Sequence, residues 1–324
     1  MDFKESIKEY CKSIGLDTIG FSKCRVFHEL EPYFESRKKY HNEFEEEDIE
    51  KRINPFIYMK DGKTIITIAF PYFHGTKKHE DIYFSKYTLG YDYHVVLAEN
   101  LRKICSFIES IGGRAIYFTD NNSLPERYIA KLSGIGFQGK NNTIITEKYG
   151  SYVFLGEIIT DLNIEEDKPV DNKCGSCNVC IASCPTGSLG EDNPNICLSY
   201  ITQKKDIDDK WFKLLNGRIF GCDSCQDICP YNKNIEFSNI LMFKPLEFME
   251  HIDVKELFSL NNKVFNEKYK KTSAGWRGKS LLQRNALINL FYNKEVSSQD
   301  IKDLKFSSPR LQHIYNRLLN IFKL

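Results

Sequence analysis

The sequence lacks the features that would place a protein in a membrane or send it out of the cell. Its longest apolar runs, such as Ile65–Phe70 and Val153–Leu155, are far shorter than a membrane-spanning helix. The first residues, Met1 to Tyr10, are polar and mixed in charge, without the apolar core of a signal peptide. We therefore expect a cytoplasmic protein that has no membrane partner.

The sequence also lacks an excess of charge, because 45 Lys and Arg stand against 44 Asp and Glu. Net charge therefore favours no nucleic-acid partner, and only a local cluster of basic residues could. No repeat is long enough to indicate a solenoid. The 324 residues allow two or three domains. Composition suggests three: 1–165 with alternating strand and helix patterns, 166–240 with most of the cysteines, and a helical region over 241–324.

Hydrophobic periodicity predicts an α+β fold whose first domain is an α/β domain. Strands are expected over 63–70, 115–118, 143–146 and 152–159, with the last two joined by a turn at 148–150. Helices are expected over 97–108, ended by Gly112-Gly113, and over 124–132, ended by Gly134; two more are expected over 287–291 and 311–319. The sequence Gly134-x-Gly136-x-x-Gly139 matches a dinucleotide-binding fingerprint. A helix precedes it and a strand follows, however, which is the reverse of the order that this fingerprint needs.

Eleven cysteines are unusual in a cytoplasmic chain, where disulfides are disfavoured. Eight of them lie within 56 residues, which indicates metal ligands. They are Cys174, Cys177, Cys180, Cys184, Cys197, Cys222, Cys225 and Cys229. The other three, Cys11, Cys24 and Cys105, have no such company and are expected to be ordinary thiols.

The cysteine spacing is typical of a ferredoxin-like domain with two 4Fe–4S clusters. Cys174-x2-Cys177-x2-Cys180-x3-Cys184-Pro185 is a full run, and Cys222-x2-Cys225-x3-Cys229-Pro230 is a partial one that Cys197 completes. The fourth cysteine of such a run ligates the other cluster. The predicted ligand sets are therefore Cys174, Cys177, Cys180 and Cys229 for one cluster and Cys184, Cys197, Cys222 and Cys225 for the other. Two structural zinc sites are the alternative, although zinc motifs rarely carry a Cys-Pro beyond the pair.

The chain resembles the epoxyqueuosine reductase family along nearly its whole length. The motifs that carry the resemblance, besides both cysteine runs, are Glu50-Lys51-Arg52, Tyr87-x-x-Gly90-x-Asp92-Tyr93-His94, Thr119-Asp120, Pro125-Glu126, Gly134-Ile135-Gly136-Phe137, Gly139-Lys140-Asn141, Tyr149-Gly150-Ser151, Leu155-Gly156-Glu157-Ile158, Trp276-Arg277-Gly278-Lys279 and Gln283-Arg284-Asn285. The resemblance implies a cobalamin enzyme that converts the epoxide of epoxyqueuosine in tRNA to the alkene of queuosine. It also implies an external donor of flavodoxin or ferredoxin type. We expect a monomer, and a helical C-terminal region with HEAT-like repeats, shorter than in some relatives.

The resemblance makes Asp120 the candidate acid that protonates the opening epoxide. An ordinary Asp has a pKa of about 3.9, so this role needs a raised pKa, which burial beside the cofactor could supply. The alternative is an Asp that caps the turn at 121–123. His94, at the expected start of a helix, is more consistent with a structural role than with cobalt ligation.

Further residues are expected to contact cobalamin. They are Arg52, Ser85, Asp120, Asn141, Ser151, Glu157, Ser199, Gln203 and Asp223. Ser85 stands where some relatives carry a cysteine near the cobalt. For Arg52, a surface salt bridge with the acidic run over 43–50 is an equal alternative.

Basic residues with interleaved aromatics over 268–284, with no acid among them, suit a tRNA backbone and an unstacked base. The expected tRNA contacts are Lys271, Trp276, Arg277, Lys279 and Arg284; a solvated helical face is the alternative. Three other functions stay open: a reductive dehalogenase-like enzyme acting on a small molecule, a non-catalytic electron carrier, and a zinc-stabilised nucleic-acid-binding protein.

Overall fold

The computed structural model describes residues 2–75, 81–120, 123–292, 304, 306 and 308–323. The chain forms two compact units, each built from three separate segments. Unit 1 comprises Met1–His74, Tyr93–Ser183 and Cys225–Met242, and unit 2 comprises Gly75–Asp92, Cys184–Ser224 and Phe243–Leu324. This division differs from the predicted linear domains 1–165, 166–240 and 241–324, because the cysteine-rich segment is shared between the units.

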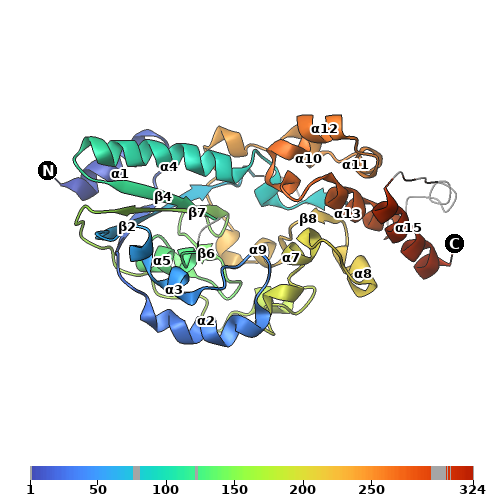
Figure 1. Ribbon diagram of the computed structural model, residues 1–324, viewed down its shortest axis with the longest axis horizontal. Coiled ribbons are helices and arrows are strands. Elements are labelled where there is room, and N and C mark those ends of the chain that lie inside the picture. Colours follow the sequence, from blue (N-terminus) through green and yellow to red (C-terminus); the bar gives the residue numbers. More distant parts are fainter. Residues whose placement is uncertain are drawn as a thin grey trace. The chain divides into compact units, whose positions relative to one another are not determined.

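Unit 1 contains a four-stranded sheet in the order β1-β2-β7-β4, in which all neighbours are antiparallel (Figure 1). The strands are β1 (Ile19–Lys23), β2 (Thr64–Pro71), β4 (Ala115–Thr119) and β7 (Val153–Thr160). The central strand β2 is rich in β-branched residues and buried along its whole length, as expected for a strand enclosed on both faces. The predictions over 63–70, 115–118 and 152–159 are confirmed.

Helices enclose this sheet from both sides (Figure 1). Helix α4 (Tyr93–Ser110) packs against β4 and β7 on one face together with α1 (Phe3–Ser13), whereas α5 (Glu126–Leu132) packs against β1, β2 and β7. Gly112 and Gly134 follow α4 and α5 with φ of 94° and 74°, a conformation that favours glycine and ends a helix. Both helix predictions are confirmed.

The expected hairpin between residues 143–146 and 152–159 is wrong. Strand β6 (Ile144–Ile145) pairs with β5 (Phe137–Gln138), and the turn is closed by an isolated bridge between Thr146 and Gly150 rather than by a ladder between the two expected strands. A Cβ at Gly136 would lie 2.5 Å from the carbonyl oxygen of Ile145, so glycine permits this close pairing. The glycine motif follows α5 and encloses β5, which is the helix-then-strand order that excludes the dinucleotide fingerprint.

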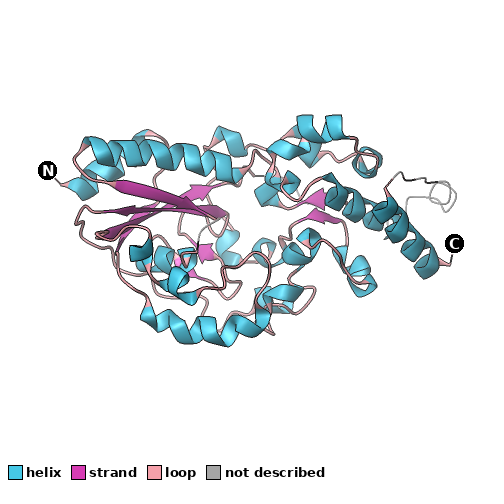
Figure 2. Ribbon diagram, in the orientation of Figure 1, coloured by secondary structure: helices cyan, strands magenta, loops and turns pink. Residues whose placement is uncertain are grey.

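Unit 2 is mostly helical (Figure 2). Its strands β3 (Tyr83–Phe84) and β8 (Arg218–Phe220) form a short parallel pair. Its helices are α7 (Leu198–Gln203), α8 (Phe212–Leu215), α10 (Glu247–Glu250), α11 (Val254–Phe258), α12 (Asn262–Glu267), α13 (Lys279–Tyr292) and α15 (Pro309–Phe322). Helix α13 is buried from Leu281 to Phe291 and contacts α7, α8, α11 and α15. The predicted helical C-terminal region is confirmed.

The remaining helices are short. They are α2 (Glu31–Arg37), α3 (Ile49–Ile53), α6 (Val179–Ala182) and α9 (Ser224–Asp227). The fold is α+β, as predicted, although the sheet of the first domain is antiparallel rather than of the parallel α/β kind. Among the described residues, no helix has both the length and the apolar character needed to cross a lipid bilayer.

Candidate functional site

Seven of the eight clustered cysteines fall into two groups, one in each unit. In unit 1, burial raises the pKa of the Cys180 thiol, and the nearby Cys174 and Cys229 raise it further. Burial, with Cys174 and Cys177, likewise raises the pKa of Cys229. Thiols repel one another's ionisation in this way only when they lie close together. The four cysteines of the first predicted ligand set therefore lie in one neighbourhood.

The second group, Cys184, Cys197 and Cys222, belongs to unit 2. Burial raises the pKa of Cys197, and Cys222 and Cys184 add to the effect. Cys225 is the residue at which the chain enters unit 1. Cys184, Cys197 and Cys222 are therefore the members of the predicted second set that the structure brings together. The assignment of ligands to clusters stays a prediction.

Backbone groups prepare the cysteine segments for anionic sulfur. The N–H of Cys177 donates to the carbonyl of Cys174 at 2.9 Å, in a tight turn where Gly175 has φ of 49°. Burial opposes ionisation of Cys184, but backbone N–H groups, led by that of Leu189, outweigh it and lower the pKa. Among the described residues, no three His, Cys, Asp or Glu are arranged as ligands of one metal ion. A 4Fe–4S cluster does not need such an arrangement, because each of its thiolate ligands binds a different iron atom.

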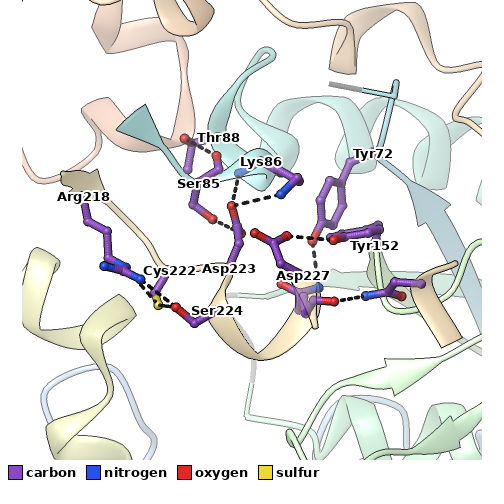
Figure 3. Close-up of polar contacts among 12 residues, drawn as sticks. Tyr72, Ser85, Lys86, Thr88, Tyr152, Arg218, Cys222, Asp223, Ser224 and Asp227 are labelled. Carbon is purple, nitrogen blue, oxygen red and sulfur yellow. Dashed lines mark hydrogen bonds and ion pairs between the residues drawn. The ribbon is translucent and has the colours of Figure 1, made fainter. Parts of the chain in front are cut away.

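Arg218 is a polar neighbour of the second group that sequence analysis missed. Its Nε donates to the sulfur of Cys222 at 3.3 Å, and its Nη2 donates to the hydroxyl of Ser224 at 2.6 Å (Figure 3). The residue is 7% exposed. The signal in the sequence was its position four residues before Cys222, but nothing in a strand pattern shows that a turn will bring the two together.

Asp120 follows the last residue of β4, beside the start of α4. The Tyr93 hydroxyl donates a hydrogen bond to its carboxylate, and Nε2 of His94 lies 3.6 Å from Oδ2. Half of the Asp120 side chain, 50%, is exposed. Burial opposes its ionisation, but His94, Tyr93 and the charge of Arg127 outweigh this and lower the pKa. The direction is opposite to that expected for an acid. The alternative cap of the turn at 121–123 involves residues 121 and 122, which lie outside the described residues.

Two further carboxyl groups lie near Asp120. Glu157 is on β7, opposite Phe118 of β4, and is fully buried with no hydrogen-bond partner for either oxygen among the described residues. Burial, with the charges of Glu126 and Asp120, raises its pKa well above the ordinary value. Burial and Asp120 raise the pKa of Glu126, at the start of α5, to about 7. Both therefore hold protons where Asp120 does not, and Glu126 was absent from the predicted site.

The other predicted cobalamin contacts in unit 1 differ in whether their polar groups are already bonded to other residues. Arg52 forms an ion pair with Glu45 at 3.6 Å, which is the alternative that sequence analysis left open. The Ser151 hydroxyl accepts hydrogen bonds from Gln226 and Asn232. The buried Nδ2 of Asn141, in contrast, has no hydrogen-bond partner in the described part of the chain.

The predicted contacts of unit 2 are largely engaged with protein groups. The Ser85 hydroxyl donates to Asp223, whose other oxygen accepts from the N–H of Lys86 at 2.9 Å (Figure 3). The Gln203 amide donates to the carbonyl of Ser199 at 2.9 Å. Sequence patterns indicated these residues, but not that they would bond to one another.

The residues of the predicted tRNA-binding strip differ in exposure. Lys271 and Trp276 are exposed, the latter by 52%, and Arg277 and Lys279 are partly exposed. Trp276 and Arg277 hold Gln203 through its side-chain and backbone oxygens. Lys268 pairs with Glu256 of α11, which is a counter-charge that the local sequence did not show.

Arg284 was wrongly predicted to contact tRNA. It is 1% exposed, and its guanidinium donates to the carbonyl oxygens of Thr202, Lys204 and Lys205. Asn285 donates to Thr202 as well, so these α13 side chains satisfy the open carbonyls at the end of α7. The motif Gln283-Arg284-Asn285 therefore serves the interior of unit 2.

Two family models match parts of the chain. Residues 173–232 match a 4Fe–4S double cluster binding domain, and this range contains all eight clustered cysteines. Residues 52–121 match the model of the epoxyqueuosine reductase QueG. The second range ends directly after Asp120.

Whole-length relatives were found by sequence and by structure. The chain is 37% identical over 316 residues to an epoxyqueuosine reductase of Bacillus anthracis, covering 92% of this chain and 83% of that one. A crystal structure of an epoxyqueuosine reductase with a tRNA-Tyr epoxyqueuosine-modified stem loop matches with a TM-score of 0.92 and 35% identity, over 98% and 89% of the two chains. The structure of the enzyme from Streptococcus thermophilus matches with a TM-score of 0.87 and 29% identity, over 100% of both chains.

Proposed function

The chain belongs to the epoxyqueuosine reductase family, and we propose that it removes the epoxide oxygen of epoxyqueuosine in tRNA to give queuosine. One observation carries this most directly: the whole fold matches a relative bound to an epoxyqueuosine-modified stem loop, while the cluster-binding segment keeps eight cysteines. The reaction consumes two electrons and two protons for each epoxide and releases water. The protein must therefore deliver both the electrons and the protons to the substrate.

The eight cysteines provide the electron supply. Each 4Fe–4S cluster passes a single electron, so two clusters suit a two-electron reduction made in single steps. The first ligand set, Cys174, Cys177, Cys180 and Cys229, lies wholly in unit 1. We assign Cys184, Cys197, Cys222 and Cys225 to the second cluster.

Asp120 is the proposed acid. It is half exposed at the end of a strand, where a substrate oxygen can reach it, and Tyr93 and His94 orient its carboxylate. In the free chain its low pKa leaves it ionised at neutral pH, so it must acquire a proton before it can donate one. The neighbouring carboxyls of Glu126 and Glu157 have raised pKa values and therefore keep their protons to a higher pH than Asp120 does. We propose that Glu126 and Glu157 supply protons to Asp120 during turnover.

Cobalamin is the proposed cofactor; when bound, it supplies the strongly reducing metal centre that breaks the carbon–oxygen bond. The chain offers a group that suits this cofactor. The buried Nδ2 of Asn141 has no hydrogen-bond acceptor among the described residues, and a carbonyl of a corrin side chain would be a suitable one. Ser85 and Glu157 are fully buried, so a cofactor reaches them only if their surroundings open. The remaining contacts proposed are Arg52, Asp120, Ser151, Ser199, Gln203 and Asp223.

We place this enzyme in the cytoplasm as a monomer, fed by a flavodoxin or ferredoxin. For tRNA, we propose contacts through Lys271, Trp276, Arg277 and Lys279, whose side chains are exposed or partly exposed. Such contacts to phosphate should weaken as salt increases. An aromatic side chain as exposed as Trp276 is suited to stack on a splayed base.

The test is anaerobic reconstitution with iron, sulfide and cobalamin, followed by incubation with epoxyqueuosine-containing tRNA and a chemical reductant. Mass spectrometry of the digested nucleosides should show epoxyqueuosine replaced by queuosine. Omission of cobalamin should abolish conversion while leaving iron content unchanged. Full iron and cobalamin loading without any loss of epoxyqueuosine would exclude the proposed reaction.

A further inference from the structure

Arg218 is a buried cation held by neutral groups. Besides the Cys222 sulfur and the Ser224 hydroxyl, its guanidinium donates to the carbonyl oxygens of Leu215 and Asn216, at 3.1 and 3.4 Å. None of these hydrogen bonds goes to a carboxylate in the described part of the chain. A buried charge without a counter-ion is expensive unless something else supplies opposite charge.

The backbone explains how Arg218 reaches the cysteine. Arg218 begins β8, and Gly221 directly after the strand has φ of 78°, which reverses the chain. A Cβ at Gly221 would lie 2.5 Å from the Cβ of Ser85, so this turn is packed too tightly for another residue. The turn brings Cys222 back beside the guanidinium, and the Ser224 hydroxyl, 3.5 Å from the Cys222 sulfur, accepts from Nη2 at the same edge (Figure 3). The contact is therefore built into the fold.

We propose that Arg218 sets the reduction potential of the cluster bound through Cys222, by donating a hydrogen bond and a positive charge to the sulfur of that ligand. The inference rests on the proposed function, in which Cys222 ligates a 4Fe–4S cluster. Arg218 acts through Cys222 and touches no substrate. Its missing counter-charge is then the cluster itself.

The direction of the effect follows from electrostatics. A 4Fe–4S cluster with four thiolates is negative, and its reduced form carries one more negative charge than its oxidised form. A nearby cation therefore stabilises the reduced form more, and a hydrogen bond to the ligand sulfur acts in the same direction. Arg218 therefore raises the reduction potential of the cluster bound through Cys222 above the value that this cluster would have without the cation.

The test is a redox titration of the reconstituted wild-type protein and of Arg218→Gln, followed by electron paramagnetic resonance. Glutamine removes the charge and the donor at Nε. We expect one cluster of the variant to become at least tenfold harder to reduce, which is about 59 mV for one electron, while the other keeps its potential. Arg317→Gln is the matched control, because Arg317 is a partly buried guanidinium of unit 2 that pairs with Asp209.

Unchanged potentials of both clusters in Arg218→Gln, at full iron content, would overturn the inference. If that variant loses iron, Arg218→Lys and Ser224→Ala take its place. The first keeps the charge without the guanidinium fork, and the second removes the hydroxyl that fixes the fork. Wild-type potentials in both would also overturn it. The titration uses no tRNA, so a wild-type protein that binds clusters but converts no epoxyqueuosine would refute the proposed function alone.

Discussion

The Ser85 hydroxyl donates a hydrogen bond to the Asp223 carboxylate, and the two residues are only 0% and 1% exposed. The second carboxylate oxygen accepts from the N–H of Lys86, whose ammonium group lies 3.9 Å away (Figure 3). Ser85 therefore supports a buried carboxylate directly after Cys222, a proposed cluster ligand. Its primary role in this chain is to satisfy Asp223.

Ser85→Ala should destabilise the protein. The substitution leaves one oxygen of a buried carboxylate without its donor, which typically costs about 1–3 kcal/mol. Denaturant unfolding monitored by circular dichroism gives the change. Ser259→Ala, which removes an exposed hydroxyl of unit 2, should stay within about 0.5 kcal/mol of wild type. Equal stability of Ser85→Ala and Ser259→Ala would show that Asp223 does not need this donor.

Cys180→Ser should remove one cluster and leave the other. Cys180 is grouped with Cys174 and Cys229, so its loss takes a thiolate from a single proposed ligand set. Iron and sulfide analysis after reconstitution should fall to about half of the wild-type content. Cys105→Ser is the control, since Cys105 is a buried thiol of α4 whose pKa is raised to about 12 by burial. Full iron in Cys180→Ser would contradict the assignment.

Asp120→Asn should slow the reaction while leaving the cofactors bound. A positioned general acid contributes about 10²- to 10⁴-fold, so single-turnover conversion of epoxyqueuosine should fall by that range. Asp161→Asn is a matched control, because Asp161 also follows a strand of the same sheet but pairs with Arg114. Undiminished turnover in Asp120→Asn would remove this residue from the mechanism.

Substitutions of Arg284 and Lys271 should affect different properties. Loss of Arg284 should lower stability, whereas loss of Lys271 should weaken tRNA binding. Arg284→Ala leaves several buried carbonyls unsatisfied and should destabilise the protein by about 3 kcal/mol or more. Lys271→Ala removes an exposed charge, so stability should be unchanged while tRNA affinity falls. Fluorescence anisotropy at several salt concentrations gives the slope of log affinity against log salt. That slope should become shallower by about one if Lys271 binds a single phosphate. The reverse pattern, in which Arg284→Ala weakens tRNA binding at unchanged stability and Lys271→Ala lowers stability alone, would show that Arg284 contacts tRNA.

The difference between these two basic residues shows what the sequence could reveal. Local periodicity was sufficient for β2 and α4, because each buries its own apolar residues in a regular pattern. The cysteine spacing was sufficient to predict a segment for two 4Fe–4S clusters, which the family model over residues 173–232 matches. In the strip over 268–284 the same kind of evidence could not tell Lys271 from Arg284. A cation looks alike in sequence whether it faces water or the carbonyl end of α7.

Contacts between distant segments were beyond any local pattern. The expected hairpin does not form, because β6 pairs with β5 whereas β7 pairs with β2 and β4. The division of the cysteine segment between two units depends on where the chain returns after residues 183 and 224. The carboxyl group of Glu126, at the start of α5, has its raised pKa because of burial and because of the charge of Asp120, which follows β4. Each of these features depends on tertiary structure.

The raised pKa of Glu126 makes a prediction about stability against pH. Its value is about 7 in the folded chain against an ordinary 4.5, so between these pH values the folded state keeps a proton that the unfolded state has lost. Stability must therefore fall as pH rises from about 4.5 to 7 and then level off. Glutamine cannot ionise, so Glu126→Gln should lose this part of the slope. Above pH 7 it should gain up to about 3 kcal/mol over wild type.

Denaturant titrations of wild type and Glu126→Gln between pH 4.5 and 8 measure this difference directly. Glu99→Gln is the control, because Lys103 lowers the pKa of that surface carboxyl and it cannot produce a loss of stability in this range. Asp120→Asn should reduce the same slope, since the Asp120 charge is one cause of the shift. A stability difference between Glu126→Gln and wild type that does not change with pH would mean that Glu126 ionises normally. It would then be no proton holder for Asp120.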